Sequence, residues 1–465
     1  MKNFIIGHKE TVHFIGIGGI GMSGLAKVMK TMKFNVQGSD MNKNKNTESC
    51  KKGGIKIFVG HLKKNISDAT IVVKSSAIKK NNIEIIQAKK RGLPIYERAE
   101  MLANIVALKK NIIITGSHGK TTTTSLVAKI LSTAKLDPTI INGGVINSIN
   151  SNAKLGKGDL TVLEADESDG SFLKLPINYS VVTNLDLEHL DFYKSYENLK
   201  KAFIKFINKT PPIGKCFVCA DSPDLKKILK KTKTKNYETY GFGKTCNYQI
   251  YNEEYHINNS KFDLIIKNKN RDKRYLKNII VSLIGKHNIL NTTAAISICL
   301  NLGISPEIIK KALYNFSGVQ RRMTKIFTKN KIEFYDDYAH HPTEIFSVLE
   351  SVKKVSKKRK IISIFQPHRY SRVNSLKLEF SKAFRHSDTV ILCPLYSAGE
   401  RKNYNYNHDK FLKLISVNSN TQVISVKDEI ELTKYLKKNL IKDEIIIGMG
   451  AGTISQWMRN LKREL

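Results

Sequence analysis

Three apolar segments of this chain are associated with glycine-containing loops, and this arrangement constrains the fold more than any other feature. Apolar residues at 11–15 precede GIGGIGMSGLAKVMK, those at 111–114 precede TGSHGKTT, and the apolar segments after residue 316 end in EIIIGMGAG. Strand-like and helical spacings of apolar residues alternate between these points. Strands that alternate with helices favour parallel, doubly wound sheets. We therefore expect an α/β protein.

The three apolar segments with their glycine-containing loops divide the chain of 465 residues into three predicted domains, 1–108, 109–315 and 316–465. A chain of this length is large enough to bury several cores. The stretch 251–280 is rich in lysine and asparagine and more polar than its surroundings, and we interpret it as a peripheral hairpin region. No repeat of solenoid period is visible.

The formal net charge of +38 raises the question of a nucleic-acid partner. The lysines are spread thinly, however, and aromatic residues are not interleaved with them as stacking platforms. We expect no nucleic-acid and no membrane partner, because no apolar run approaches the ~18 residues that span a bilayer. The short apolar patch near the start is too small for a signal peptide, so we expect a cytoplasmic protein with reduced cysteines. Cys216 and Cys219 lie in an apolar, strand-like stretch and are interpreted as core residues.

The first glycine loop reads Gly16-x-Gly18-x-x-Gly21, with Asp40 about 20 residues further on. Glycines permit close approach of the backbone, and amides at a helix start bind a pyrophosphate, while the acid suits a ribose hydroxyl. A nicotinamide dinucleotide and a nucleotide sugar both satisfy this pattern. The motif therefore predicts a nucleotide diphosphate without selecting one. The candidate binding residues are Gly18, Gly19, Ile20, Gly21 and Asp40.

The second glycine loop is the stronger signal. It departs from the GxxxxGK[ST] pattern, since Ile114 stands at the first glycine, but the shortened form GxxGKT lies between an apolar strand and an amphipathic helix. Backbone amides would cradle phosphates, Lys120 would neutralise their oxygens, and Thr121 would place its hydroxyl on Mg²⁺. The candidate nucleotide-binding residues here are Gly116, Ser117, His118, Gly119, Lys120, Thr121 and Thr122.

Two further residues follow strands of the same module. Glu164 lies near the end of the segment LTVLEAD, and His189 comes shortly after the segment YSVVTNLD. Ligands collect at the carboxyl ends of parallel strands, so both side chains are expected near the phosphates. We predict that Thr121, Glu164 and His189 bind magnesium and that Lys120, Glu164 and His189 are catalytic.

Eight sequence blocks now indicate a family. SHGKTTTT, EADESDGSF, NLDLEHLDFY, GKHNILN, GVQRR, YDDYAHHPTE, FQPHRYSR and GAGTIS occur in the order found in Mur ligases, and the match covers roughly 11–460. The chain resembles this family along nearly its whole length. YDDYAHHPTE and FQPHRYSR resemble the branch that adds L-alanine. Ser117 stands where threonine is common.

The resemblance implies a Rossmann-like domain for the UDP-sugar, a central P-loop ATPase domain and a Rossmann-like domain for the amino acid. It also implies ATP and Mg²⁺ as cofactors, and UDP-N-acetylmuramate and L-alanine as substrates. In this picture Glu164 touches both of two magnesium ions. The implied adenosine contacts are His287, Asn288 and Asn291, with Arg322 and Asp337 also reaching ATP. The implied alanine contacts are Tyr338, Arg369 and Arg372.

The implied reaction is carboxylate activation by ATP, in which an acyl phosphate is attacked by the amine of alanine. The sequence identifies no base for that amine and carries no indication of oligomeric state. A nicotinamide-dependent dehydrogenase would leave Lys120, Glu164 and His189 without a role. A nucleic-acid-dependent P-loop ATPase would require stacking aromatics or an arginine-finger pattern. The ligase that recycles murein peptides is similar in the same blocks, but it attaches a preformed peptide, and it is the alternative that the motifs leave open.

Overall fold

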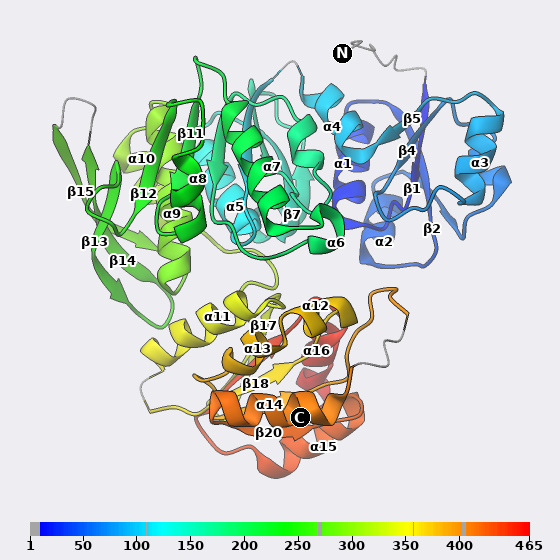
Figure 1. Cartoon of the computed structure of the whole chain (residues 1–465). Helices are drawn as coiled ribbons and strands as arrows, with labels where there is room; N and C mark the ends of the chain where they lie inside the picture. Colours follow the sequence, from blue (N-terminus) through cyan, green and yellow to red (C-terminus); the bar gives the residue numbers. More distant parts are fainter. Residues whose placement is uncertain (1–9, 108, 268–271, 357, 402–405) are drawn as a thin grey trace. The chain divides into compact units, whose positions relative to one another are not determined.

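The computed structural model describes residues 10–107, 109–267, 272–356, 358–401 and 406–465 (Figure 1). Contacts divide the chain into two compact units. The first comprises the described residues up to Asn252 together with Phe262–Ile280 and Leu290–Ser317. The second comprises Glu253–Lys261, Val281–Ile289 and Gly318–Leu465. The first unit holds the N-terminal sheet and most of the central sheet, and the third sheet belongs to the second unit.

The N-terminal sheet is parallel, in the order β3-β2-β1-β4-β5. Its strands are β1 (Thr11–Ile15), β2 (Asn35–Asp40), β3 (Lys56–Val59), β4 (Ile71–Lys74) and β5 (Ile95–Glu97). The helices are α1 (Ile20–Thr31), α2 (Lys45–Lys52), α3 (Ile83–Lys90) and α4 (Arg98–Val106). In Figure 1, α1 and α3 lie on opposite sides of this sheet. The apolar residues of β1 and β4 are therefore buried on both faces, as the sequence predicts.

The central sheet has the order β15-β14-β13-β12-β11-β10-β6-β9-β7-β8. Its first strands are β6 (Lys110–Thr115), β7 (Thr139–Ile146), β8 (Ser151–Lys154), β9 (Leu160–Glu164) and β10 (Tyr179–Val182). The others are β11 (Lys215–Cys219), β12 (Tyr237–Gly241), β13 (Tyr248–Tyr255), β14 (Ser260–Lys267) and β15 (Lys273–Val281). The last three occupy one end of the sheet, as expected for the polar stretch 251–280, of which 268–271 lie outside the described residues. Cys216 and Cys219 on β11 are buried free thiols, and burial raises the pKa of each to about 12.

The helices of the central module lie between its strands in the chain or follow its last strand, β15. They are α5 (Lys120–Thr133), α6 (Leu190–Tyr193), α7 (Tyr196–Asn208), α8 (Pro223–Leu229), α9 (Lys286–Asn301) and α10 (Pro306–Tyr314). Buried aromatic residues fix α7, because Phe203 and Phe206 both contact the ring of Phe172, at 5.5 and 5.1 Å between centroids. The helix thereby covers the segment that follows β9 and positions the residues after Glu164.

The third sheet has the order β16-β17-β21-β18-β19-β20. Its strands are β16 (Thr324–Lys329), β17 (Ile332–Asp337), β18 (Ile361–Phe365), β19 (Thr389–Leu392), β20 (Gln422–Ser425) and β21 (Ile445–Met449). Its helices are α11 (Pro342–Val355), α12 (Tyr370–Ser375), α13 (Lys377–Lys382), α14 (His408–Ser419), α15 (Glu429–Asn439) and α16 (Ile454–Glu464). Phe334, Ile364 and Ile446 share its buried core.

Not every pair of neighbouring strands is parallel, although the sequence predicts parallel sheets. β8 runs antiparallel to β7, and β16 runs antiparallel to β17. The β16–β17 connection is short: Asn330 and Lys331 both have positive φ, 50° and 65°. This is the conformation of a tight hairpin turn, which joins antiparallel strands without a crossover helix. Among the described residues, no helix is both long and apolar enough to cross a membrane.

Candidate active site

The phosphate-binding loop predicted from the sequence forms a tight passage from β6 to α5. Gly116 has φ +134°, and a Cβ there would lie 2.1 Å from the Thr183 hydroxyl. Gly119 has φ +81°, and a Cβ there would lie 2.3 Å from Oδ1 of Asn291. Any side chain at these two positions would clash, so the loop requires glycine at both.

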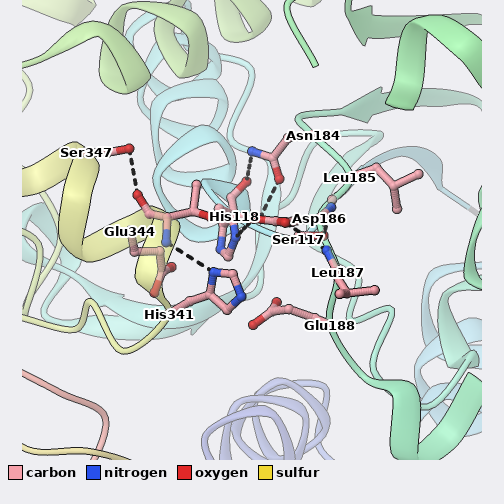
Figure 2. Close-up of polar contacts among 12 residues, drawn as sticks. Ser117, His118, Asn184, Leu185, Asp186, Leu187, Glu188, His341, Glu344 and Ser347 are labelled. Atoms are coloured by element: carbon pink, nitrogen blue, oxygen red, sulfur yellow. Dashed lines mark hydrogen bonds and ion pairs between the residues drawn. The ribbon is translucent and has the colours of Figure 1, made fainter. Parts of the chain in front are cut away.

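The segment after β10 holds this loop from one side (Figure 2). The amide of His118 donates to Oδ1 of Asn184 at 2.7 Å, and Nδ2 of Asn184 donates to the His118 carbonyl at 3.0 Å. The Ser117 hydroxyl accepts from the amide of Asp186 at 2.8 Å, and the Asp186 carboxylate lies 3.1 Å from Nε2 of His118. The first half of the predicted nucleotide site is therefore fixed by side-chain contacts from a neighbouring strand end.

Lys120 is turned back onto its own loop. Its ammonium donates to the carbonyls of Gly116 and Ser117, at 2.6 and 3.0 Å, and lies 2.9 Å from Oε2 of Glu167. Burial opposes the charged form, but neighbouring carboxylates, Glu167 first, raise the pKa of Lys120 above its ordinary value. The lysine is a permanent cation whose three hydrogens are directed at acceptors of the protein.

Thr121 and Glu164 meet as the sequence suggested. The Thr121 hydroxyl donates to Oε1 of Glu164 at 3.1 Å, and the Gly143 amide donates to Oε2 at 2.6 Å. Glu164 is the last residue of β9, whose neighbours are β6 and β7. A hydroxyl beside a carboxylate is a donor set of hard oxygens, which suits Mg²⁺. Thr122, the next residue of α5, is buried.

His189 contacts two other carboxylates, which the sequence reasoning missed. Its Nε2 lies 3.3 Å from Oε1 of Glu167 and 3.7 Å from Oε2 of Glu188. Burial opposes protonation, but the hydrogen bond to Glu167 and both charges raise the pKa of His189. Glu167, Glu188 and His189 are close enough together to hold one metal ion. Glu167 therefore contacts both Lys120 and His189. Glu167 lies in the acidic segment EADESD, three residues after Glu164, but the segment alone does not distinguish it from the other acids there.

The N-terminal loop places its predicted residues side by side. Asp40 ends β2, and its Oδ2 accepts from the Gly18 amide at 2.8 Å. A Cβ at Gly18 would lie 2.7 Å from the same oxygen. Gly19 caps α1, which begins at Ile20, and Gly21 is in its first turn. The loop, the start of a helix and the acid thus form the arrangement expected for a nucleotide diphosphate.

The residues implied for adenosine fall on α9, which passes from the second unit into the first. Asn291 belongs to the first unit and lies against Gly119, as described above. His287 and Asn288 belong to the second unit, where Nδ2 of Asn288 donates to the Ile284 carbonyl at 2.8 Å. Burial, with the nearby charge of Arg322, lowers the pKa of His287 to about 4, so its ring is neutral at physiological pH.

At the end of β17, Asp337 is buried between two backbone donors. Its carboxylate accepts from the amides of Met323 and Ala339, at 2.7 and 2.8 Å. Burial raises its pKa to about 6, although Arg322 and these hydrogen bonds oppose the shift. The guanidinium of Arg322 lies 3.7 Å from Oε1 of Glu344 and 5.4 Å from the centre of the Tyr338 ring.

The residues implied for alanine gather at the carboxyl ends of β17 and β18. Nη1 of Arg372 lies 3.2 Å from Nδ1 of His368, and the His368 ring lies 5.9 Å from that of His340. The His340 ring is in turn 5.1 Å from that of Tyr338. Arg369 is exposed, has φ +69° and caps α12. His340 and His368 were not selected from the sequence as site residues, although both lie in the quoted blocks.

Comparison with known proteins shows which family has this sequence. Three family models match successive parts of the chain: "Mur ligase family, catalytic domain" at 11–110, "Mur ligase middle domain" at 114–299 and "Mur ligase, glutamate ligase domain" at 321–452. A protein of Pelagibacter ubique named UDP-N-acetylmuramate–L-alanine ligase is 56% identical over 452 residues, 97% of each chain. One of Brucella anthropi with the same name is 42% identical over 98% of this chain and 97% of its own.

Solved structures also match nearly the whole chain. A crystal structure of UDP-N-acetylmuramate-alanine ligase from Thermotoga maritima matches with a TM-score of 0.83 and 29% identity over 98% of each chain. A murein peptide ligase from Psychrobacter arcticus matches with a TM-score of 0.73 and 22% identity over 98% of each chain, which is a likeness of fold. With three family models along its length and full-length relatives at this level of identity, the chain belongs to the Mur ligase family.

Proposed function

We propose that this protein joins L-alanine to the lactyl carboxylate of UDP-N-acetylmuramate, with hydrolysis of ATP to ADP and phosphate. This is the first step in building the peptide of a peptidoglycan precursor. The observation that carries the proposal is full-length identity of 56% to a protein of that name. The phosphate-binding loop and the arginine-rich end of the third sheet supply the chemistry that such a ligase needs.

Activation of the carboxylate depends on the phosphate-binding loop. A carboxylate is a poor acylating agent, and transfer of the γ-phosphate gives it a leaving group. We assign Lys120 to the transferring phosphoryl oxygens, where a cation stabilises the charge that develops in the transition state. To reach them, its ammonium must leave Glu167, 2.9 Å away. The amides of Gly119 and Lys120 at the start of α5 complete the anion site.

Magnesium fits the oxygen donors beside this loop. We assign Thr121 and Glu164 to one ion, because hydroxyl and carboxylate oxygens converge there at 3.1 Å. We propose that His189 binds a second ion. Its partner would be Glu164, as the family resemblance implies, or Glu167, whose Oε1 lies 3.3 Å from Nε2 of His189. Bound magnesium supplies charge neutralisation at the phosphates. Glu164 and Glu167 hold the hydroxyl of Thr121 and the imidazole of His189 in place for it.

Recognition of the amino acid is assigned to Tyr338, Arg369 and Arg372. A guanidinium presents two parallel donors to a carboxylate, a geometry that an ammonium does not reproduce. The first domain would hold the UDP part, with the pyrophosphate on Gly18–Gly21 and the ribose near Asp40. Because ATP and a nucleotide sugar are both required, we place the reaction in the cytoplasm.

One assay tests the proposal against its nearest competitor. Purified protein with ATP, Mg²⁺ and UDP-N-acetylmuramate is supplied with single amino acids or with a tripeptide that begins L-Ala-γ-D-Glu, and ADP release is measured. We expect L-alanine to give the highest kcat/KM. Preference for the tripeptide would make the protein a recycling ligase, and absence of ADP release with every acceptor would refute ligation altogether.

A further inference from the structure

Two histidines face each other at the carboxyl edge of the third sheet. β17 and β18 both run parallel to β21, so the segments that follow them emerge at the same edge. His340 follows β17 and His368 follows β18, with ring centroids 5.9 Å apart and ring planes at 67°. Arg372 contacts His368, and Tyr338 contacts His340, so the pair lies among the residues assigned to alanine.

The hydrogen bonds of His340 decide which nitrogen carries its proton. Nδ1 lies 2.9 Å from the carbonyl oxygen of Tyr338. A carbonyl oxygen only accepts, so Nδ1 is the donor and the lone pair of the neutral ring is on Nε2. Glu344 reinforces this, because its Oε2 lies 3.4 Å from Nδ1 and accepts from the His340 backbone amide at 3.2 Å. A carboxylate behind the donor nitrogen stabilises the imidazolium that forms when Nε2 takes a proton.

The hydrogen bonds of His368 give the opposite result. Its Nδ1 lies 3.2 Å from Nη1 of Arg372, and a guanidinium only donates. Nδ1 therefore accepts and Nε2 carries the hydrogen. Burial, together with the charges of His340 and the neighbouring arginines, lowers the pKa of His368 to about 3. The ring also stacks on Tyr396, at 5.5 Å between centroids and 19° between planes. His368 is a fixed neutral donor and is not suited to accept a proton.

We propose that His340 is the general base that deprotonates the ammonium of the incoming amino acid. This rests on the ligase function proposed above. An N–H bond of the ammonium breaks, the proton moves to Nε2 of His340, and the nitrogen keeps the electron pair. That pair forms the bond to the acyl carbon, and the bond from that carbon to the phosphate oxygen breaks. The second nitrogen proton leaves with the phosphate, and the imidazolium returns its proton to water.

The charged groups around His340 suit this cycle. Glu344 faces it from α11, and Arg322 lies 3.7 Å from the other oxygen of that carboxylate. From the β18 side it faces His368, which is neutral, with Arg372 behind. The arginines attract the carboxylate of the amino acid, while Glu344 offsets the charge that His340 gains. The site would therefore bind the carboxylate of the amino acid at the arginines and its ammonium at His340.

The test separates formation of the acyl phosphate from attack by an amine. Hydroxylamine is largely unprotonated at neutral pH, so it attacks an acyl phosphate without a base and gives a hydroxamate. For His340→Ala we expect ligation of L-alanine to fall by about 10²-fold or more in kcat, while the rate of hydroxamate formation stays within about threefold of wild type. Added imidazole is expected to restore part of the ligation, and higher pH should narrow the deficit because the amine then loses its proton to solvent.

Several variants keep the result decisive. His340→Gln is a second variant in case His340→Ala does not fold. Glu344→Gln is expected to lower kcat less than either His340 variant does. His386, which contacts Phe346 in the same unit, provides a control: His386→Ala should retain both reactions. If His340→Ala ligates alanine normally, or loses alanine ligation and hydroxamate formation together without rescue by imidazole, His340 is not the base. If the wild type forms neither product from UDP-N-acetylmuramate, the proposed function itself fails.

Discussion

The ammonium of Lys120 lies 2.9 Å from Oε2 of Glu167, and the other oxygen of that carboxylate lies 3.3 Å from Nε2 of His189. One buried carboxylate thus contacts both the lysine of the phosphate-binding loop and the histidine assigned to magnesium. On the proposed assignment of Lys120 to the phosphates, nucleotide binding would break the first of these contacts. The affinity for nucleotide would then include the cost of separating Lys120 from Glu167.

Replacement of Lys120 tests the assignment of the loop. Lys120→Ala is expected to lower kcat by at least about 10²-fold, roughly 3 kcal/mol, because a transition-state contact to the phosphoryl oxygens is lost. Turnover is measured beside the thermal transition, which shows whether the variant is folded. A folded variant with near-normal turnover would contradict the assignment.

Replacement of Glu167 separates its two contacts. In Glu167→Gln the ammonium of Lys120 loses its ion pair, so we expect ATP without magnesium to bind several-fold more tightly in calorimetry. The magnesium requirement of ligation is expected to rise, because His189 loses its charged partner. Glu164→Gln is the matched comparison, and it should raise the magnesium requirement without the gain in magnesium-free affinity. Identical behaviour of the two variants would show that Glu167 has no separate role.

The ligand of the first domain distinguishes a ligase from a dehydrogenase. We expect calorimetry to detect UDP-N-acetylmuramate and to detect neither NAD(H) nor NADP(H). Asp40→Asn should weaken the UDP-sugar by about tenfold, since the Asp40 carboxylate both holds the Gly18 amide and is assigned to the ribose. Micromolar binding of a nicotinamide dinucleotide would overturn this assignment.

Arg372 is expected to recognise the carboxylate of alanine. Arg372→Ala should raise the KM for L-alanine by at least roughly tenfold, about 1.4 kcal/mol, with a much smaller change in the KM for ATP. Arg372→Lys should recover only part of the loss, because an ammonium restores charge but not the paired donors. Equal loss of affinity for ATP and alanine would indicate that the arginine acts through domain closure instead.

Glu84 is a buried carboxylate of the first domain that is expected to make stability depend on pH. It accepts from the Ser39 hydroxyl and from Nδ2 of Asn65, both at 2.6 Å, and lies 3.3 Å from Nε2 of His13. Burial opposes the charged form, but these hydrogen bonds outweigh it and lower the pKa of Glu84. A folded-state pKa below the unfolded value contributes stability above the unfolded pKa, ~4.3, and loses it as pH falls through the folded pKa.

Glu84→Gln should therefore reduce the free energy of unfolding by about 1–3 kcal/mol at pH 7. The difference from wild type should shrink below about pH 4, where the wild-type carboxyl also becomes neutral. Urea unfolding followed by circular dichroism at pH 7 and at pH 3.5 measures both values, with the exposed Glu48→Gln as control. A difference that is independent of pH would mean that the charge of Glu84 contributes nothing.

Much of this protein follows from local sequence. Apolar segments of four to six residues before glycine loops predicted the parallel strands β1 and β6 and the helices that follow them, because strand periodicity and backbone freedom of glycine are local properties. The loop residues Gly116–Thr121 and the meeting of Thr121 with Glu164 also followed, since residues at the carboxyl ends of adjacent parallel strands share one edge. The quoted blocks, read in order, indicated the family.

Other features were decided only when distant segments came together. Nothing local in the sequence selects Glu167 among the acids of EADESD as the partner of Lys120 and His189, which are 47 and 22 residues away. The antiparallel β8 and β16 follow from tight turns whose positive φ angles are adopted by Asn150, Asn330 and Lys331, none of them glycine. The proton positions of His340 and His368 depend on whether each Nδ1 faces a carbonyl or a guanidinium. Sequence determines which groups are available, but hydrogen bonds and ion pairs act over about 3 Å, so tertiary structure decides which of them meet.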